Sequence, residues 1–179
     1  LVEGSRNRFI NNLVAGFDRA PEAHIFAASR APWIALDDGL PAFDAYPPGV
    51  DAEPVASPPS DLPEGRVGGA CLCGAVAWQV EGAPVRMYHC HCRRCRLARG
   101  TGFATNVFYP FDAFAWRRGE DRIVRYALPG ARFFGTAFCR DCGAPVPRPQ
   151  RERGVAVVAA GSFAVDPGIR PSAHLYVGS

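Results

Sequence analysis

The chain has 179 residues, of which 48% are hydrophobic and 21% are charged, and its formal net charge at pH 7 is +3. This is the composition of a globular protein that is long enough for one domain with a core and an additional segment. No apolar run approaches the ~20 residues that cross a bilayer, which excludes a transmembrane protein. All 20 basic residues are arginine, and the absence of lysine excludes a Schiff-base lysine mechanism.

The N-terminal region differs in composition from the rest of the chain. Leu1 to Phe9 carries charge where the apolar segment of a secretory signal should begin, so we expect a cytoplasmic protein. Residues 1–66 hold 5 arginines against 10 acidic residues, whereas residues 67–179 hold 15 against 7. Six prolines between Pro47 and Gly65 predict an extended linker. We therefore divide the chain into a segment at 1–46, a Pro-rich linker at 47–66 and a domain at 67–179.

Beyond the linker, the sequence pattern predicts short strands. Aromatic and β-branched residues occur in short runs between glycine and proline breaks, which is typical of strands. These runs lie at 75–80, 85–88, 103–108, 123–126, 133–138, 155–160 and 174–177. Only the stretch from Arg94 to Arg99 is compatible with a helix. The large aromatic residues expected in the core are Trp78, Trp116 and the pair Phe133–Phe134. The sequence thus predicts an all-β (β-rich) domain.

All seven cysteines lie in this domain, in groups of two, three and two. The groups are Cys71 and Cys73, then Cys90, Cys92 and Cys95, then Cys139 and Cys142. An odd number of cysteines without a secretion signal argues against a disulfide framework. Gaps of one or two residues let a short turn present several thiolates to one metal ion, and a glycine after Cys73 and after Cys142 fits such a turn. The sequence predicts two zinc ions per chain.

Seven ligands divide most naturally as four plus three. The two Cys-Gly pairs are similar and distant in sequence, so together they predict a closed structural site. This site would consist of Cys71, Cys73, Cys139 and Cys142. The remaining group of Cys90, Cys92 and Cys95 leaves a fourth zinc position open, which is typical of a catalytic site. In an extended strand His91 would point away from the cysteines, but a turn there would allow it to close the site, and the sequence leaves this alternative open.

The sequence also contains a short internal repeat. Residues 23–29, Ala-His-Ile-Phe-Ala-Ala-Ser, parallel residues 173–179, Ala-His-Leu-Tyr-Val-Gly-Ser. Upstream, residues 14–16 parallel residues 159–161. The region near 8–29 therefore resembles a second copy of the last two strands of the domain.

Three cysteine motifs form a pattern that resembles one protein family. They are Gly69-Ala-Cys71-Leu-Cys73-Gly74-Ala-Val-Ala-Trp78, Cys90-His-Cys92-Arg-Arg-Cys95-Arg96 and Phe138-Cys139-Arg-Asp-Cys142-Gly143. They are similar to the motifs of the GFA family, the glutathione-dependent formaldehyde-activating enzymes, whose relatives include centromere protein V. The resemblance covers about 67–179. It also covers about 8–46, since residues 24–43 look like the closing tail of a GFA domain.

The resemblance implies a fold, metal sites and an activity. The fold is a set of several small coiled antiparallel sheets organised around zinc. The metal sites are a structural four-cysteine zinc and a catalytic zinc on Cys90, Cys92 and Cys95, which agrees with the division reached from spacing. The activity is the joining of formaldehyde to glutathione as S-(hydroxymethyl)glutathione, which is classed as a carbon–sulfur lyase activity.

A zinc ion held by three thiolates favours thiol chemistry. It is better suited to accept a fourth thiolate, whose pKa it lowers, than to polarise a carbonyl. We therefore expect glutathione or a similar thiol to bind there and attack formaldehyde or a small aldehyde. Four neighbouring arginines are candidates for binding the glutathione carboxylates, or for merely offsetting the thiolate charge. They are Arg93, Arg94, Arg96 and Arg99.

The alternative function is a non-catalytic zinc module that contacts nucleic acid or protein. The positive charge of residues 67–179 favours it. No stripe of arginines alternates with aromatic residues, so we do not expect a nucleic-acid partner.

The segment at 1–46 contains no cysteine and is too short for a core of its own. Residues such as Phe9, Trp33 and Phe43 make it too apolar for a disordered tail. We expect it to pack on the zinc domain as the missing tail, either within one chain or between the chains of a homodimer. The alternative is that it is the remnant of an upstream copy in a longer protein.

Overall fold

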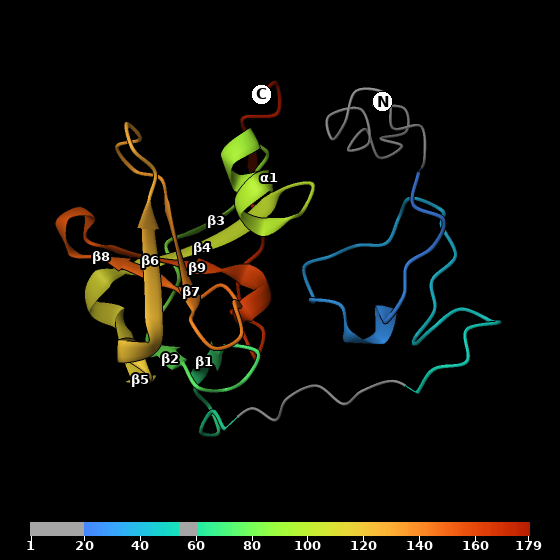
Figure 1. The fold of residues 1–179 in the computed structure, drawn as a ribbon, viewed down its shortest axis with the longest axis horizontal. Helices are drawn as coiled ribbons and strands as arrows, with labels where there is room; N and C mark the ends of the chain where they lie inside the picture. The colour runs from blue at the N-terminus through green and yellow to red at the C-terminus, as the bar shows by residue number, and fades with distance from the viewer. Residues whose placement is uncertain (1–19, 54–60) are drawn as a thin grey trace. The chain divides into compact units, whose positions relative to one another are not determined.

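The computed structural model describes residues 20–53 and 61–179 of the chain (Figure 1). The repeat residues 14–16, the apolar Phe9 and part of the predicted linker lie outside this described part. The chain divides into two compact units, Leu1–Ser57 and Pro58–Ser179. We call the second the cysteine-bearing unit, because all seven cysteines belong to it. Within the described ranges, no helix is long and apolar enough to cross a membrane.

The cysteine-bearing unit is built from three small sheets, which confirms the predicted β-rich class (Figure 1). The three-stranded sheet, in the order β1-β2-β5, consists of Val67–Ala70, Ala77–Val80 and Phe114–Arg118. The five-stranded sheet has the order β10-β3-β4-β9-β8, with β3 at Arg86–Cys90, β4 at Ala104–Pro110, β8 at Arg148–Gln150, β9 at Val155–Ala159 and β10 at Ala173–Leu175. The two-stranded sheet pairs β6 at Ile123–Ala127 with β7 at Gly135–Cys139. All pairs are antiparallel except β10, which runs parallel to β3.

A single α-helix, α1 at Arg93–Arg99, is found among the described residues. It begins at Cys92, whose Sγ accepts a hydrogen bond from the backbone N–H of Cys95 at 3.4 Å. It ends at Gly100, which adopts a left-handed conformation with φ of 61°. The helix therefore starts one residue before the predicted stretch. Short 3-10 helices lie at Ala27–Ser29, Phe111–Ala113, Glu120–Arg122, Arg151–Arg153 and Ala160–Ser162.

Both larger sheets contribute buried residues to the core. Trp78 is fully buried, with its ring edge-on to Phe163 and stacked on Phe114, at centroid distances of 4.8 and 6.2 Å. Val107 of β4 and Val158 of the neighbouring strand β9 are paired in register, and both are fully buried. Alternating buried positions along β4 and β9 are those expected of strands with one face on the core.

Phe133, by contrast, is 53% exposed, so its predicted place in the core is wrong. It lies just before β7, in the connection from β6. The guanidinium groups of Arg132 and Arg153 lie over its ring at 4.9 and 4.6 Å from the centroid. These cation–π contacts give the ring partners at the surface.

The described part of the first unit is held by a parallel bridge between His24 and Ala42. The backbone N–H of His24 donates to Pro41 O, and the N–H of Phe43 donates to His24 O, both at 2.8 Å. The His24 imidazole Nε2 lies 3.0 Å from both carboxylate oxygens of Asp38. This hydrogen bond holds the pKa of Asp38 below its usual value.

The two copies of the internal repeat have the same local backbone at their aromatic residue. Phe26 and the corresponding Tyr176 have φ of 55° and 57°, and no other non-glycine residue of the described ranges has a positive φ. Three residues later, the N–H of Ser29 donates to Phe26 O at 3.0 Å, and that of Ser179 donates to Tyr176 O at 3.4 Å. The similarity of 23–29 and 173–179 therefore extends from sequence to conformation.

Candidate metal centres

The structure brings four cysteines together from the two Cys-Gly turns. The Sγ atoms of this four-cysteine cluster all lie within 4.8 Å of one another. Its members are Cys71, Cys73, Cys139 and Cys142. The first pair follows β1, and the second begins at the last residue of β7, so the cluster ties two separate sheets together. Cys71 and Cys139 are buried, whereas Cys73 is exposed.

Both turns of this cluster have the geometry that the glycines predicted. Gly74 and Gly143 have φ of 74° and 71°, a region that strongly favours glycine. Each glycine N–H donates at 2.9 Å to the carbonyl of the first cysteine of its pair. Beyond the first turn, the backbone N–H of Val76 donates to the Cys71 Sγ at 3.2 Å. Backbone donors aimed at sulfur stabilise thiolates, which are the metal-binding form of cysteine.

The thiols of the four-cysteine cluster differ in acidity. Burial is the main cause that raises the pKa of Cys71 to about 12. Burial acts in the same direction on Cys142, but backbone hydrogen bonds from Ala144 and Cys73 outweigh it and lower the pKa of Cys142 to about 7. Closely packed sulfurs, one of them readily ionised, form a donor set that suits a soft tetrahedral cation.

The second cluster lies where β3 leads into α1. Cys90 is the last residue of β3, Cys92 caps the helix and Cys95 lies in its first turn. The three Sγ atoms of this three-cysteine cluster lie within 4.8 Å of one another. No histidine, carboxylate or further cysteine from the described residues joins them. The cluster therefore offers three sulfur ligands.

The histidines beside this cluster contact one another instead. His91 Nε2 lies 2.8 Å from Nδ1 of His174, which β10 brings alongside β3. His89 Nδ1 lies 2.8 Å from the Thr105 hydroxyl, and its ring packs edge-on to Phe103 at 4.5 Å. The closed alternative, with His91 as fourth ligand, is therefore not the arrangement found here.

Cys92 is the most acidic thiol of the three-cysteine cluster. Burial opposes ionisation of Cys92, but hydrogen bonds from the Cys95 backbone, from the neighbouring thiols and from Arg94 lower its pKa. Burial and the neighbouring thiols raise the pKa of Cys95. A thiolate at the N-terminus of α1 also interacts favourably with the helix dipole.

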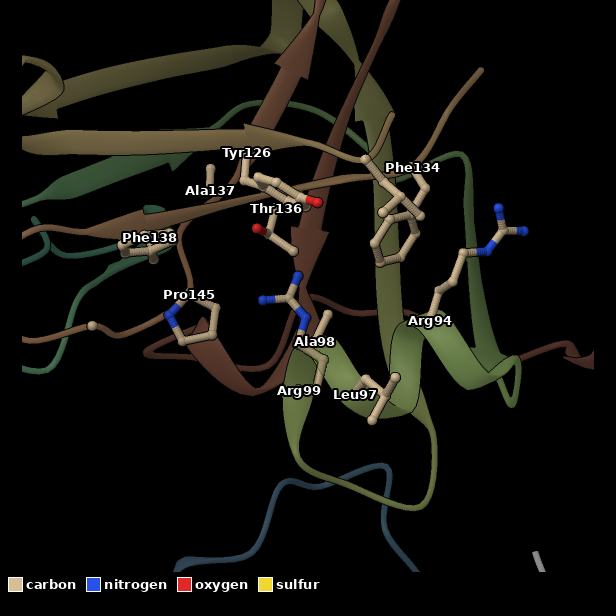
Figure 2. Close-up of a pocket in the computed structure, with 12 residues that line it drawn as sticks. Arg94, Leu97, Ala98, Arg99, Tyr126, Phe134, Thr136, Ala137, Phe138 and Pro145 are labelled. Carbon is tan, nitrogen blue, oxygen red and sulfur yellow. The ribbon is translucent and has the colours of Figure 1, made fainter. Parts of the chain in front are cut away.

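A cavity of about 420 Å³ opens beside α1 (Figure 2). Its walls come from α1, from the β6–β7 hairpin and from the turn after Cys142, so they include residues next to both cysteine clusters. The lining residues are Arg94, Leu97, Ala98, Arg99, Tyr126, Leu128, Phe134, Thr136, Ala137, Phe138, Gly143 and Pro145. Most of these side chains are apolar, and none is acidic.

The four arginines predicted beside the cluster are not equivalent. Arg94 and Arg99 line the cavity, whereas Arg93 and Arg96 do not. Arg94 lies over the ring of Phe134, at 5.6 Å from the centroid. Figure 2 shows Arg99 extending from α1 toward Thr136, while the end of Arg94 points away from the centre of the cavity.

Neither the cavity nor Arg148 is indicated by the sequence. Arg148 lies on β8, about 50 residues beyond α1 in the chain. Burial is the main cause that lowers its pKa, and the positive charges of Arg99 and Arg153 add to the effect. No spacing signal connects Arg148 with Arg99, because only the folding of β8 against β9 brings them near each other.

Two comparisons with known proteins gave a match. Residues 66–179 match the family described as glutathione-dependent formaldehyde-activating enzyme, GFA. A solved structure, the crystal structure of a Rhodobacter sphaeroides protein from a structural genomics programme, is similar at 26% identity with a TM-score of 0.46. The similarity covers 58% of this chain and 97% of that one. A search of curated proteins found no match. Since the family match spans more than half of the chain, the protein belongs to the GFA family.

Proposed function

We propose that this protein is a zinc-dependent enzyme that joins glutathione, or a similar thiol, to formaldehyde or a small aldehyde. The observation that carries the proposal is the three-cysteine cluster, which has no fourth protein ligand among the described residues. The family match supports the reaction class. In the reverse direction the reaction breaks a carbon–sulfur bond, as expected of a carbon–sulfur lyase.

The donor atoms of both clusters fit zinc. Each cluster offers only sulfur, at mutual distances that suit tetrahedral coordination. We propose that Cys71, Cys73, Cys139 and Cys142 hold a structural ion, and that Cys90, Cys92 and Cys95 hold a catalytic one. When bound at the second cluster, zinc would lower the pKa of an incoming thiol and hold it as the thiolate.

The reaction needs little from the protein besides positioning. The thiolate sulfur attacks the aldehyde carbon, so that a C–S bond forms and the C=O π bond breaks. The resulting alkoxide oxygen then takes up one proton, which balances the proton that the thiol lost. The contribution of the chain is to bind the thiol beside the three-cysteine cluster. Arg94 and Arg99, which line the neighbouring cavity, are our candidates for binding its carboxylates.

The first prediction is that the purified protein contains two zinc ions per chain. The reason is that each cluster supplies at least three thiolates, which bind zinc tightly at neutral pH. Metal analysis by mass spectrometry, with protein concentration from amino-acid analysis, gives the ratio. A ratio below one would contradict both metal sites.

The second prediction is that binding of glutathione releases the proton of its thiol. A free thiol has a pKa near 8.5 and is therefore mostly protonated at pH 7, so binding as a thiolate should release about one proton. Calorimetric titration of glutathione in two buffers of different ionisation enthalpy measures this release. Below neutral pH the affinity should fall by about tenfold per pH unit.

The matched control for this titration is S-methylglutathione, which has the same carboxylates but no ionisable thiol. It should bind without proton release and with little dependence on pH. If glutathione also bound without releasing a proton, the carboxylate contacts alone would account for binding, and the proposed thiol chemistry would be wrong.

A further inference from the structure

We propose that the cavity beside α1 binds an organic carboxylate with an apolar body, and that Arg99 receives the carboxylate. The inference rests on the proposed function for the role of the ligand, which we take to be the thiol substrate. It defines the substrate class as thiols with a carboxylate that has no cationic group beside it, as the glycine carboxylate of glutathione has none, on a body that can pack against apolar side chains.

Arg99 is placed to meet an anion. Its side chain is half-buried and extends from α1 into the space beside Thr136 (Figure 2). No hydrogen bond or ion pair to the side chain of Arg99 is found among residues 20–53 and 61–179. A half-buried guanidinium group without a protein carboxylate has five donors available to a ligand.

A second arginine adds to the positive charge at this place. Arg148 is also half-buried, and its Nη1 donates to the carbonyl of Gly135 at 2.5 Å, at the start of β7. Burial lowers the pKa of Arg99, and burial together with the charge of Arg99 lowers that of Arg148. The cavity wall itself contains Arg94 and Arg99 and no acidic residue, which favours an anionic ligand and disfavours a cationic one.

The rest of the wall selects an apolar body. Leu97, Phe134 and Pro145 line the cavity, and its only hydroxyl groups come from Tyr126 and Thr136. A volume of about 420 Å³ is within the usual range of small-molecule sites. In such an apolar site, a bond between a guanidinium group and a carboxylate is stronger than it would be in water.

The position of Arg99 connects the cavity to the thiol chemistry. Arg99 follows Cys95 by four residues on α1, so the two side chains lie on the same face of the helix, one turn apart. Arg99 thus connects the wall of the cavity to the helix whose first turn carries Cys95.

The experiment compares 6-mercaptohexanoate with 6-mercaptohexanol by calorimetry on the zinc-loaded full chain. We expect the acid to bind at least about tenfold more tightly than the alcohol, because only the acid can pair with Arg99. In Arg99→Gln this preference should fall to less than about twofold, with the affinity for the alcohol unchanged. The matched control is Arg125→Gln, which removes an exposed arginine of β6 that pairs with Glu120, and it should keep the full preference.

The outcomes separate this inference from the proposed function. Equal binding of acid and alcohol to the unmodified protein, or a preference that survives in Arg99→Gln, would overturn the cavity proposal even if both thiols release a proton. Hexanoate and hexanol, which lack the thiol, should show the same Arg99-dependent preference. If they do while no thiol releases a proton, the cavity proposal stands and the thiol chemistry fails.

Discussion

Replacement of Cys139 by serine is expected to leave the cysteine-bearing unit unfolded at room temperature. Cys139 is fully buried at the end of β7 and belongs to the four-cysteine cluster that ties the β6–β7 hairpin to the turn after β1. Structural zinc contributes about 10–16 kcal/mol to the folding of small zinc domains. A loss of even about 4 kcal/mol of this would remove most of the stability of an ordinary domain, which is about 5–15 kcal/mol in total.

Near-ultraviolet circular dichroism and thermal denaturation measure this effect. The spectrum of Cys139→Ser should lose its aromatic signals, since the fully buried Trp78 would no longer be held by packing. The zinc content should also decrease. A cooperative melting transition within about 5 °C of that of the unmodified protein would contradict the structural role of this cluster.

Replacement of Cys92 by serine, unlike that of Cys139, should leave the fold intact and remove the activity. Cys92 caps α1 through its Sγ, and serine is one of the best residues for this position, so the helix keeps its cap. The three-cysteine cluster, however, loses its most acidic thiol and one of only three ligands. Because metal-assisted catalysis commonly supplies several kcal/mol, we expect the rate to fall by at least about 100-fold.

The rate is measured by exchange NMR on an equilibrium mixture of glutathione, formaldehyde and their adduct, which allows the catalysed interconversion to be compared with the spontaneous one. Cys92→Ser should lower the zinc content from two ions to one and leave the melting temperature within a few degrees. If Cys92→Ser and Cys139→Ser unfolded alike, the division into a structural and a catalytic centre would be wrong.

The local parts of this fold could be predicted from the sequence. Short cysteine spacings restrict where the thiolates of one turn can point, and the glycines after Cys73 and Cys142 fit a single turn geometry. The strand that contains Trp78 and the strand that ends at Cys90 follow from runs of aromatic and β-branched residues. In each case the information lies within about ten consecutive residues.

Features that depend on contacts distant in sequence were not predictable. β1 contains two consecutive glycines, Gly68 and Gly69, which by themselves suggest a turn. Gly69 is explained by close packing instead, because a Cβ atom at this position would lie 2.0 Å from the backbone oxygen of Ser162. Pro149 in β8 argues against a strand, but the proline is tolerated there because β8 lies at the edge of its sheet. The cavity likewise needs α1, β6 and β7 in place before it exists. The packing of residues 1–46 as a tail, within the chain or in a homodimer, stays a prediction.

The left-handed conformation shared by Phe26 and Tyr176 bears on the history of the chain. For a residue with a bulky side chain this conformation is unfavourable by about 1–2 kcal/mol, so two unrelated turns would rarely both place an aromatic residue there. Its occurrence at the same position of two matching heptapeptides points to descent from a common ancestral segment. Duplication of one segment would account for both similarities, that of the sequences at 23–29 and 173–179 and that of their backbone conformations.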